Sequence, residues 1–392
     1  MSSAVQKIGI NIGGSSTDSV SFSTLRNTFF KETPDSATPT GTVKASDLLR
    51  TTALPASGTQ TSPTVPDATE NSTIVTSASN WKVSHFQQSV KFYNINQTGT
   101  DLNYDIDAQS WNSNLTKNVV KRWRVGGTVG SENSSTAAAF SASAHNLRIE
   151  VLGSILGYGG KGGGTSGAPA ISGEAAGDAL EVSSSSGRVV VDVKSTGKIY
   201  GGGGGGERGE NGINGSAQVC YQDNPTGQGC DSAPPCPAGT TVVGTPSHGP
   251  CGQKMVPAPG EWGWGHYWQP FGTKRSNICR TQETSTAPQG GTGGNGAPGR
   301  GYNNQSGSLT GPIGTPAGGT PSCSSGFTVL TPGNSPTAAT AGGNGGNGGA
   351  YGSAGDNTPN TGNGGSAGRA IFGSNYQIVG STGSENIKGS TN

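Results

Sequence analysis

The sequence of 392 residues has little charge and little apolar material. Charged residues make up 12% of the chain, hydrophobic residues make up 29%, and the net charge is only +1. Because globular domains are usually about 45–50% apolar, these values exclude a large conventional core. Disorder of the usual kind is also disfavoured, since disordered chains avoid burial through high net charge. The order of this chain must therefore come largely from backbone hydrogen bonds.

The sequence also lacks the marks of membrane, secreted and nucleic-acid-binding proteins. No run approaches the length of about 20 apolar residues that a membrane-spanning helix needs. The N-terminus lacks the apolar stretch and cleavage site of a signal peptide. No basic stripe that would bind phosphates is present either. We therefore expect neither membrane insertion nor nucleic-acid binding.

Patterns for catalysis are equally scarce. No nucleophile-elbow or phosphate-loop motif occurs, and the four histidines lie in unrelated contexts. Asp101, Asp105 and Asp107 are close in sequence, but solvated or turn-capping carboxylates explain them best. We therefore expect no enzyme activity, no catalytic residues and no cofactor.

Glycine is what the chain has in abundance, with 70 residues. Several runs are almost pure glycine, and those at 290–296 and 342–349 repeat with a period of three residues. A polyproline II-type helix also has three residues per turn, and it leaves its backbone groups free to bond outward. Stacked helices of this kind need glycine for their close approach. We therefore predict packed polyglycine II-type helices, with a flexible glycine linker as the alternative.

A near-repeat within the glycine-rich part weakens the linker alternative. Residues 177–201 and residues 368–389 both read as a glycine, a short apolar strand, a second strand and an Ile-x-Gly ending. Flexible linkers do not usually carry embedded apolar strands. The repeat predicts strands that flank a layered glycine-helix body.

Composition divides the chain into three parts. Residues 1–78 are rich in Ser, Thr and Pro and predict an extended arm that becomes ordered against a partner. Residues 79–156 alternate apolar and polar side chains, which predicts a small antiparallel β domain. Residues 157–392 predict a glycine-rich tip with insertions at 216–289 and 302–341. The predicted fold is thus mainly β and irregular.

The arm contains two similar short segments that we expect to anchor the chain. Each reads Val-x-x-Ser-x-Leu, followed by Arg within two residues. The expected attachment residues are Val20, Phe22, Leu25, Val43, Leu48 and Leu49.

All six cysteines fall between residues 220 and 323. None forms a close pair of the kind that zinc sites use, so we expect no metal site. Disulfides that staple a loop without a core of its own are the better interpretation. The candidates, whose connectivity the sequence leaves open, are Cys220, Cys230, Cys236, Cys251, Cys279 and Cys323.

The first insertion also holds the densest aromatic cluster of the chain. Aromatic rings with one polar edge dominate binding hot spots and stack well on sugars. A local mini-core under the disulfide loop would use the same residues, and both interpretations stay open. The candidate receptor-binding residues are Trp262, Trp264, His266, Tyr267, Trp268 and Phe271.

Taken together, these motifs resemble phage proteins. Residues 105–125, with Ser110-Trp111-Asn112, and residues 146–155 are similar to tail-fibre proteins of marine and cyanobacterial phages. The segments at 20–28 and 43–51 resemble attachment segments of tailed-phage structural proteins. The glycine runs, their Ile-x-Gly endings and the variable insertions resemble the glycine-rich adhesins at tail-fibre tips.

The resemblance implies a virion structural protein, a tail fibre or adhesin, that binds the host cell surface during adsorption. In that family, polyglycine helices stack into a sandwich and hypervariable loops contact the receptor. The implied partners are other tail or virion proteins, bound through the arm, and a host glycan or outer-membrane protein. We further expect a homotrimer that is made in the host cytoplasm and located in the virion. The alternatives are a purely structural fibre or decoration protein, a polysaccharide depolymerase, and a cellular glycine-rich surface protein.

Overall fold

The chain forms two compact units, which are described separately. The computed structural model describes residues 20–29, 42, 44–51, 65–86, 89–165, 171–182, 189–257, 266–329, 337–359 and 362–392. The first unit comprises Met1–Glu210, Gly293–Ile313 and Asn344–Asn392, and the second comprises Asn211–Thr292 and Gly314–Gly343. Strands greatly outnumber helices in both, so the predicted mainly β fold is confirmed.

The first unit begins with short helices around a small apolar cluster. Its elements are α1 (Phe22–Phe29), the 3-10 helices η1 (Ala45–Leu48), η2 (Thr69–Asn71), η3 (Ala78–Asn80) and η4 (Val83–Phe86), and the short parallel strands β1 (Arg50–Thr51) and β2 (Val65–Pro66). Leu25, Phe29, Leu48, Val65, Ile74 and Phe86 are buried together. The described part of the predicted arm is therefore folded rather than extended. Its few apolar residues meet because α1 presents Leu25 and Phe29 on one side.

Three parallel sheets follow and form the walls of a β-helix. The first wall contains β3 (Phe92–Gln97), β6 (Val120–Val125), β9 (Leu147–Val151), β12 (Val189–Val193) and β22 (Tyr376–Gly380). The second contains β4 (Thr100–Leu102), β7 (Thr128–Gly130), β10 (Ser154–Leu156), β13 (Lys198–Tyr200) and β23 (Ile387–Lys388). The third contains β5 (Tyr104–Asp105), β8 (Ala139–Ser141), β11 (Leu180–Val182) and β21 (Ile371–Gly373).

The prediction of an antiparallel domain at 79–156 was wrong in strand direction. Each turn of the chain except the last contributes one strand to each wall, so equivalent strands run parallel. One column of paired residues on the first wall consists of Ile95, Trp123, Ile149, Val191 and Ile378. Alternating polarity identifies a strand with one buried face, whatever the direction of its neighbour. The sequence pattern could therefore not reveal the direction.

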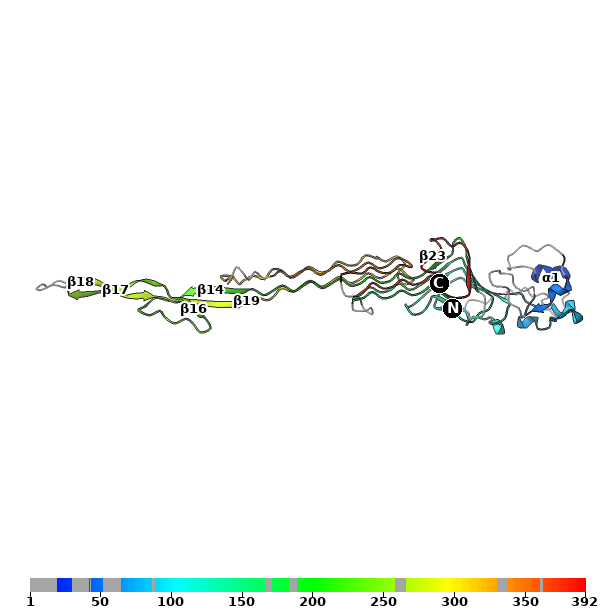
Figure 1. Ribbon diagram of the computed structural model, residues 1–392, viewed down its shortest axis with the longest axis horizontal. Coiled ribbons are helices and arrows are strands. Elements are labelled where there is room, and N and C mark those ends of the chain that lie inside the picture. Colours follow the sequence, from blue (N-terminus) through cyan, green and yellow to red (C-terminus); the bar gives the residue numbers. More distant parts are fainter. Residues whose placement is uncertain are drawn as a thin grey trace. The chain divides into compact units, whose positions relative to one another are not determined.

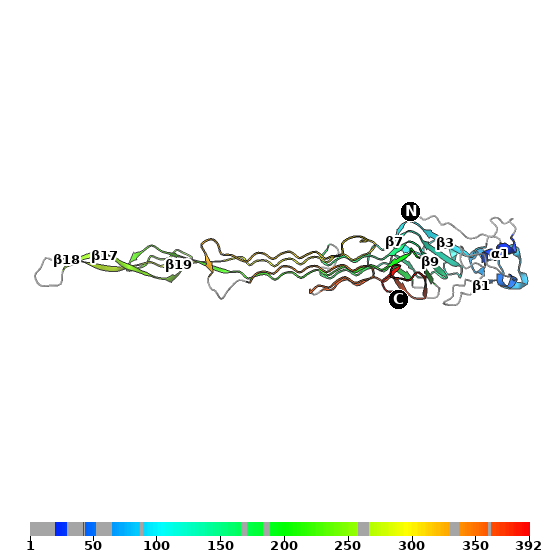
Figure 2. The same cartoon turned by 90° about the horizontal axis from the view of Figure 1, so that it is seen from above.

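The near-repeat forms the last two turns of this β-helix. Leu180 pairs with Ile371, Val191 with Ile378, and Ile199 with Ile387, all in parallel register. Residues 201–370 are thus an excursion between β13 and β21, after which the chain returns to complete the sheets. In Figure 2 the red C-terminal strands lie beside the strands of the β-helix.

The glycine runs of the first unit bond to one another at every third residue. Along residues 201–209, successive N–H groups donate in rotation to three neighbouring segments. The acceptors are Gly177, Glu174 and Ile171 on one segment, Arg300, Ala297 and Gly294 on a second, and Ser353 and Asp356 on a third. The N–H of Gly201, at the start of the run, donates to the carbonyl of Lys388 in β23. Figure 1 draws these runs as wavy ribbons without arrows. This is the bonding that a three-residue helical period requires.

The hydrogen-bonded glycine runs of the first unit form an array around residues 201–209. Side chains are excluded from the centre of this array. A β-carbon added at any of residues 201–206 would lie 1.8–2.1 Å from a carbonyl oxygen of a neighbouring segment. All six glycines are buried, although each has only a backbone to bury. The uninterrupted glycine run therefore follows from close backbone approach on every side.

The second unit combines glycine-rich segments with two antiparallel sheets. The four-stranded sheet has the order β16 (Thr241–Gly244), β19 (Ile278–Thr284), β14 (Val219–Pro225) and β20 (Thr328–Val329). The three-stranded sheet has the order β15 (Gly229–Cys230), β18 (His266–Arg275) and β17 (Ser247–Pro257). Glycine-rich segments of this unit also bond between backbones, for example Gly212 N to Gly291 O and Gly342 N to Thr315 O.

In the part of the chain that the structure describes, no helix is both long and apolar enough to cross a membrane.

Candidate functional site

The predicted aromatic cluster falls on a β-hairpin of the second unit. Strands β17 and β18 pair in antiparallel register, with Gly252 opposite Phe271 and Val256 opposite Tyr267. His266, Tyr267 and Trp268 begin β18, whereas Trp262 and Trp264 lie outside the described residues. The Phe271 side chain is 43% exposed. It lies over Gly252, where an added β-carbon would meet its ring at 3.3 Å.

Three disulfides connect the strands around this hairpin. Cys230 pairs with Cys251, Cys236 with Cys279, and Cys220 with Cys323, with Cα–Cα separations of 5.5–5.7 Å. The structure leaves no cysteine of the chain free. The Cys220–Cys323 bond joins the two insertions that the sequence separates, because β20 pairs with β14. The parts of the two insertions that lie in the second unit are therefore cross-linked.

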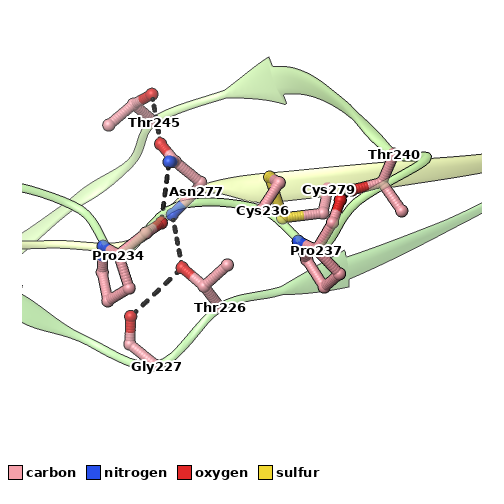
Figure 3. Close-up of a disulfide and its surroundings, with 9 residues drawn as sticks. All are labelled: Thr226, Gly227, Pro234, Cys236, Pro237, Thr240, Thr245, Asn277 and Cys279. Carbon is pink, nitrogen blue, oxygen red and sulfur yellow. Dashed lines mark hydrogen bonds between the residues drawn. A yellow bond between two sulfur atoms is a disulfide. The ribbon is translucent and has the colours of Figure 1, made fainter.

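Asn277 organises the turn between β18 and β19, beside the Cys236–Cys279 disulfide (Figure 3). Its backbone N–H donates to the Thr226 hydroxyl at 2.9 Å, and its side-chain amide donates to the Pro234 carbonyl at 2.9 Å. Its amide oxygen accepts from the Thr245 hydroxyl at 3.0 Å. One asparagine thus links three segments that have no regular pairing at this point. The sequence did not reveal this role, because a single Asn before a strand forms no recognisable motif.

A second cluster that sequence analysis missed lies across strands β14 and β19. Arg280 donates from Nε and Nη2 to the two carboxylate oxygens of Asp223, at 2.8 and 2.7 Å. The guanidinium centre lies 4.0 Å from the centre of the Tyr221 ring. These hydrogen bonds hold the pKa of Asp223 below its usual value and raise that of Arg280. Side chains two residues apart in a strand point to the same face of the sheet. The spacing of Tyr221 and Asp223 was therefore the signal that they share a face, and the strand pairing places Arg280 opposite Asp223.

Exposed apolar residues also occur on the four-stranded sheet. Val242 is 50% exposed, Val243 is 42% exposed, and both lie on the edge strand β16. Isolated exposed apolar side chains are common on protein surfaces. Together with Phe271 and with Val219, which is 39% exposed on β14, they are the exposed large apolar residues that the described strands of the two sheets offer to a partner.

The expected attachment residues gather in the first unit. Leu25 and Leu48 are fully buried in the N-terminal apolar cluster, and Val20 packs against it. Leu49 is half-buried, and Val43 lies outside the described residues. Phe22 is 52% exposed, and its ring stacks on Trp81 with centroids 5.6 Å apart. Phe22 is therefore the member of this set that a partner could reach most easily.

Among the described residues, no group of three or more His, Cys, Asp or Glu side chains is arranged to hold a metal ion. Asp107 shows what the acidic residues do instead. Its carboxylate accepts from the Ser141 hydroxyl and from the N–H groups of Ala142 and Ser143, at 2.7–2.8 Å. This carboxylate therefore caps a turn.

Comparison with known proteins identifies the class. Residues 88–269 match the family model "Phage tail fibre adhesin Gp38", which spans just under half of the chain. The match confirms the resemblance to glycine-rich phage adhesins, and with it the expected function of a host-binding tail fibre protein. It places the chain in the virion tail and points to a structural role.

One solved structure is similar to this chain: the crystal structure of the gp37–gp38 adhesin tip complex of the bacteriophage S16 long tail fibre. The TM-score is 0.34 and the sequence identity is 18%, with 81% of this chain and 88% of that chain covered. No curated protein matches the sequence.

Proposed function

We propose that the second unit carries the receptor-binding surface, with the β17–β18 hairpin at its centre. The observation that carries this proposal is the position of the aromatic cluster. Residues 258–265 connect two antiparallel strands of 11 and 10 residues, and a disulfide ties the hairpin to β15. Cross-linked strands reduce the conformational entropy that a binding loop loses on contact.

The chemistry of this surface favours neutral ligands. The unit contains Lys and Arg residues equal in number to its Asp and Glu residues, and Arg280 is already paired with Asp223. Tryptophan and tyrosine rings offer flat apolar faces with a polar edge. We propose a host surface glycan or an apolar patch of an outer-membrane protein as the receptor, bound without covalent chemistry.

Adsorption measurements test this proposal. Virions that carry Trp264→Ala and Trp268→Ala should assemble normally but adsorb to the host several-fold more slowly. The matched control, Tyr221→Ala with Phe327→Ala, removes two rings of the same unit outside the hairpin and should leave adsorption close to normal. Normal adsorption of the hairpin variant, with its disulfides intact, would assign these aromatics to a mini-core.

We propose that the N-terminal apolar cluster attaches the chain to another tail protein of the virion. The exposed Phe22 ring on Trp81 supports this, because an exposed aromatic pair beside a small core can serve as an anchor. The purified Phe22→Ala protein should still bind host cells but should be missing from virions. Normal incorporation of this variant would place the attachment surface elsewhere.

The absence of catalysis and the homotrimer both stay predictions. Incubating the protein with host surface polysaccharide should release no new reducing ends, whereas a depolymerase would release them steadily. A β domain limited to residues 79–156 would gain stability from assembly into a homotrimer, but β21–β23 add residues to that part. Light scattering decides it, and a single species of 39.0 kDa would exclude the trimer.

A further inference from the structure

Six Asn-Gly dipeptides occur in the sequence, and all of them lie in described, glycine-rich segments. They are Asn211-Gly212, Asn214-Gly215, Asn295-Gly296, Asn344-Gly345, Asn347-Gly348 and Asn363-Gly364. Asparagine before glycine is the most reactive context for deamidation, because glycine has no β-carbon to hinder approach of its nitrogen to the Asn side chain. Each Asn-Gly dipeptide therefore supplies a glycine to these segments and also a site that is prone to deamidation.

In each dipeptide the glycine nitrogen is already engaged. The N–H groups of Gly212, Gly215, Gly296, Gly345 and Gly348 donate to Gly291 O, Pro288 O, Gly163 O, Pro312 O and Leu309 O at 2.7–3.0 Å, and that of Gly364 donates to Asn357 Oδ1 at 2.7 Å. An N–H that donates to an acceptor oxygen is shielded by that hydrogen bond from the base that must remove its proton. The hydrogen bond also holds the glycine nitrogen against its acceptor, so that this nitrogen cannot approach Cγ of the preceding Asn.

We propose that these six Asn-Gly bonds are latent modification sites, closed by the hydrogen bonds of the glycine segments and reactive only when a segment opens. The reaction starts when the freed glycine nitrogen loses its proton to solvent base and attacks Cγ of the preceding Asn. The C–N bond of the side-chain amide breaks, ammonia leaves, and a five-membered succinimide forms. Water then adds to one of the two succinimide carbonyls, the ring C–N bond at that carbonyl breaks, and the nitrogen takes up a proton, which gives Asp or isoAsp.

The products hinder the segment from closing again, as Asn347 illustrates. Its Oδ1 accepts from Gly311 N at 3.1 Å, and its Nδ2 donates to Asp356 Oδ2 at 2.8 Å. Aspartate at this position loses the donor and places two carboxylates together. IsoAsp adds a methylene to the main chain, which displaces the N–H groups that bond at three-residue intervals. One opening event followed by reaction therefore becomes irreversible.

Peptide mapping by mass spectrometry tests the proposal on the full chain. Native protein and protein unfolded in urea with reductant are incubated side by side at about pH 8, and Asp and isoAsp are quantified at the six sites. We expect each site to react at least about tenfold more slowly in the native protein, equivalent to an opening cost of about 1.4 kcal/mol. Equal rates in the two samples would overturn the proposal.

A single substitution tests the local mechanism. Gly311→Ala places a methyl group 2.0 Å from Gly345 O, so it should open the bonds made by Gly345 and Gly348. Deamidation at Asn344 and Asn347 should rise, while Asn211 and Asn214 in the second unit stay slow. Gly383→Ala, where the added methyl meets nothing within 4 Å, is the control. Hydrogen exchange reports the opening directly, and open Gly345 and Gly348 amides without faster deamidation would also overturn the proposal.

Discussion

At the scale of single residues, the missing side chain at Gly204 is essential for the array. An added β-carbon would lie 1.8 Å from Gly365 O and 2.9 Å from Gly355 N, and both partners are backbone atoms. Because backbones on several sides cannot all move, Gly204→Ala should destabilise the first unit by about 3 kcal/mol or more. Urea unfolding measures this loss, with Gly383→Ala as a same-unit control that should change little. Equal stability of the two variants would contradict the close packing.

Tyr104 gives the first unit a dependence on alkaline pH. Its ring stacks on Trp123 with centroids 4.7 Å apart, and burial, with a smaller contribution from Asp101, raises its pKa well above the ordinary value of 10. Burial also raises the pKa values of Tyr158, Tyr200, Tyr351 and Tyr376. Above pH 10 the unfolded chain loses these protons while the folded chain keeps them. The contribution of these tyrosines to the free energy of unfolding should therefore be steady below pH 10 and fall above it.

Unfolding curves between about pH 8 and pH 12 test this dependence. Tyr104→Phe keeps the ring on Trp123 and removes the ionising group, so its stability should fall less steeply above pH 10. A slope identical to that of the unchanged protein would show that Tyr104 does not contribute.

At the scale of elements, the disulfides support strands that have little core of their own. Cys220–Cys323 closes a sequence separation of 103 residues and holds β20 against β14, whereas Cys230–Cys251 closes only 21. Because a longer loop gains more entropy when it is released, Cys220→Ser with Cys323→Ser should cost about 3–4 kcal/mol.

The matched pair, Cys230→Ser with Cys251→Ser, should cost less. Calorimetry can follow the two units as separate transitions, and only that of the second unit should move. A shift of the first-unit transition, or a larger loss in the short-loop variant, would contradict this reading.

At the scale of the whole molecule, the last residues of the chain complete a β-helix that begins near residue 92. Removal of 371–392 would uncover the edges of β11, β12 and β13, whose paired residues include the buried Leu180, Val191 and Ile199. Open parallel edges bind other chains, so the truncated protein should aggregate. Size-exclusion chromatography measures this outcome. Adding the 371–392 peptide should partly restore the dispersed form, and a dispersed truncated chain with unchanged melting would contradict the prediction.

The sequence alone determined the features that depend on local pattern. The mainly β fold followed from alternating polarity, and the family resemblance followed from glycine runs, strand motifs and insertions. The near-repeat at 177–201 and 368–389 was visible because each half carries its own short strands. The hairpin aromatics were visible because three of the six tryptophans of the chain fall within residues 262–268.

Only the tertiary structure decided which segments are partners. Alternation cannot distinguish parallel from antiparallel neighbours, so the β-helix became evident only when Ile199 was found beside Ile387. Cysteine spacing could not choose Cys323 for Cys220, since that choice follows from the pairing of β20 with β14. Arg280 met Asp223 and Tyr221 for the same reason. Local patterns record which face of a segment is buried, whereas the partner is selected by burial and backbone hydrogen bonding between residues far apart in the sequence.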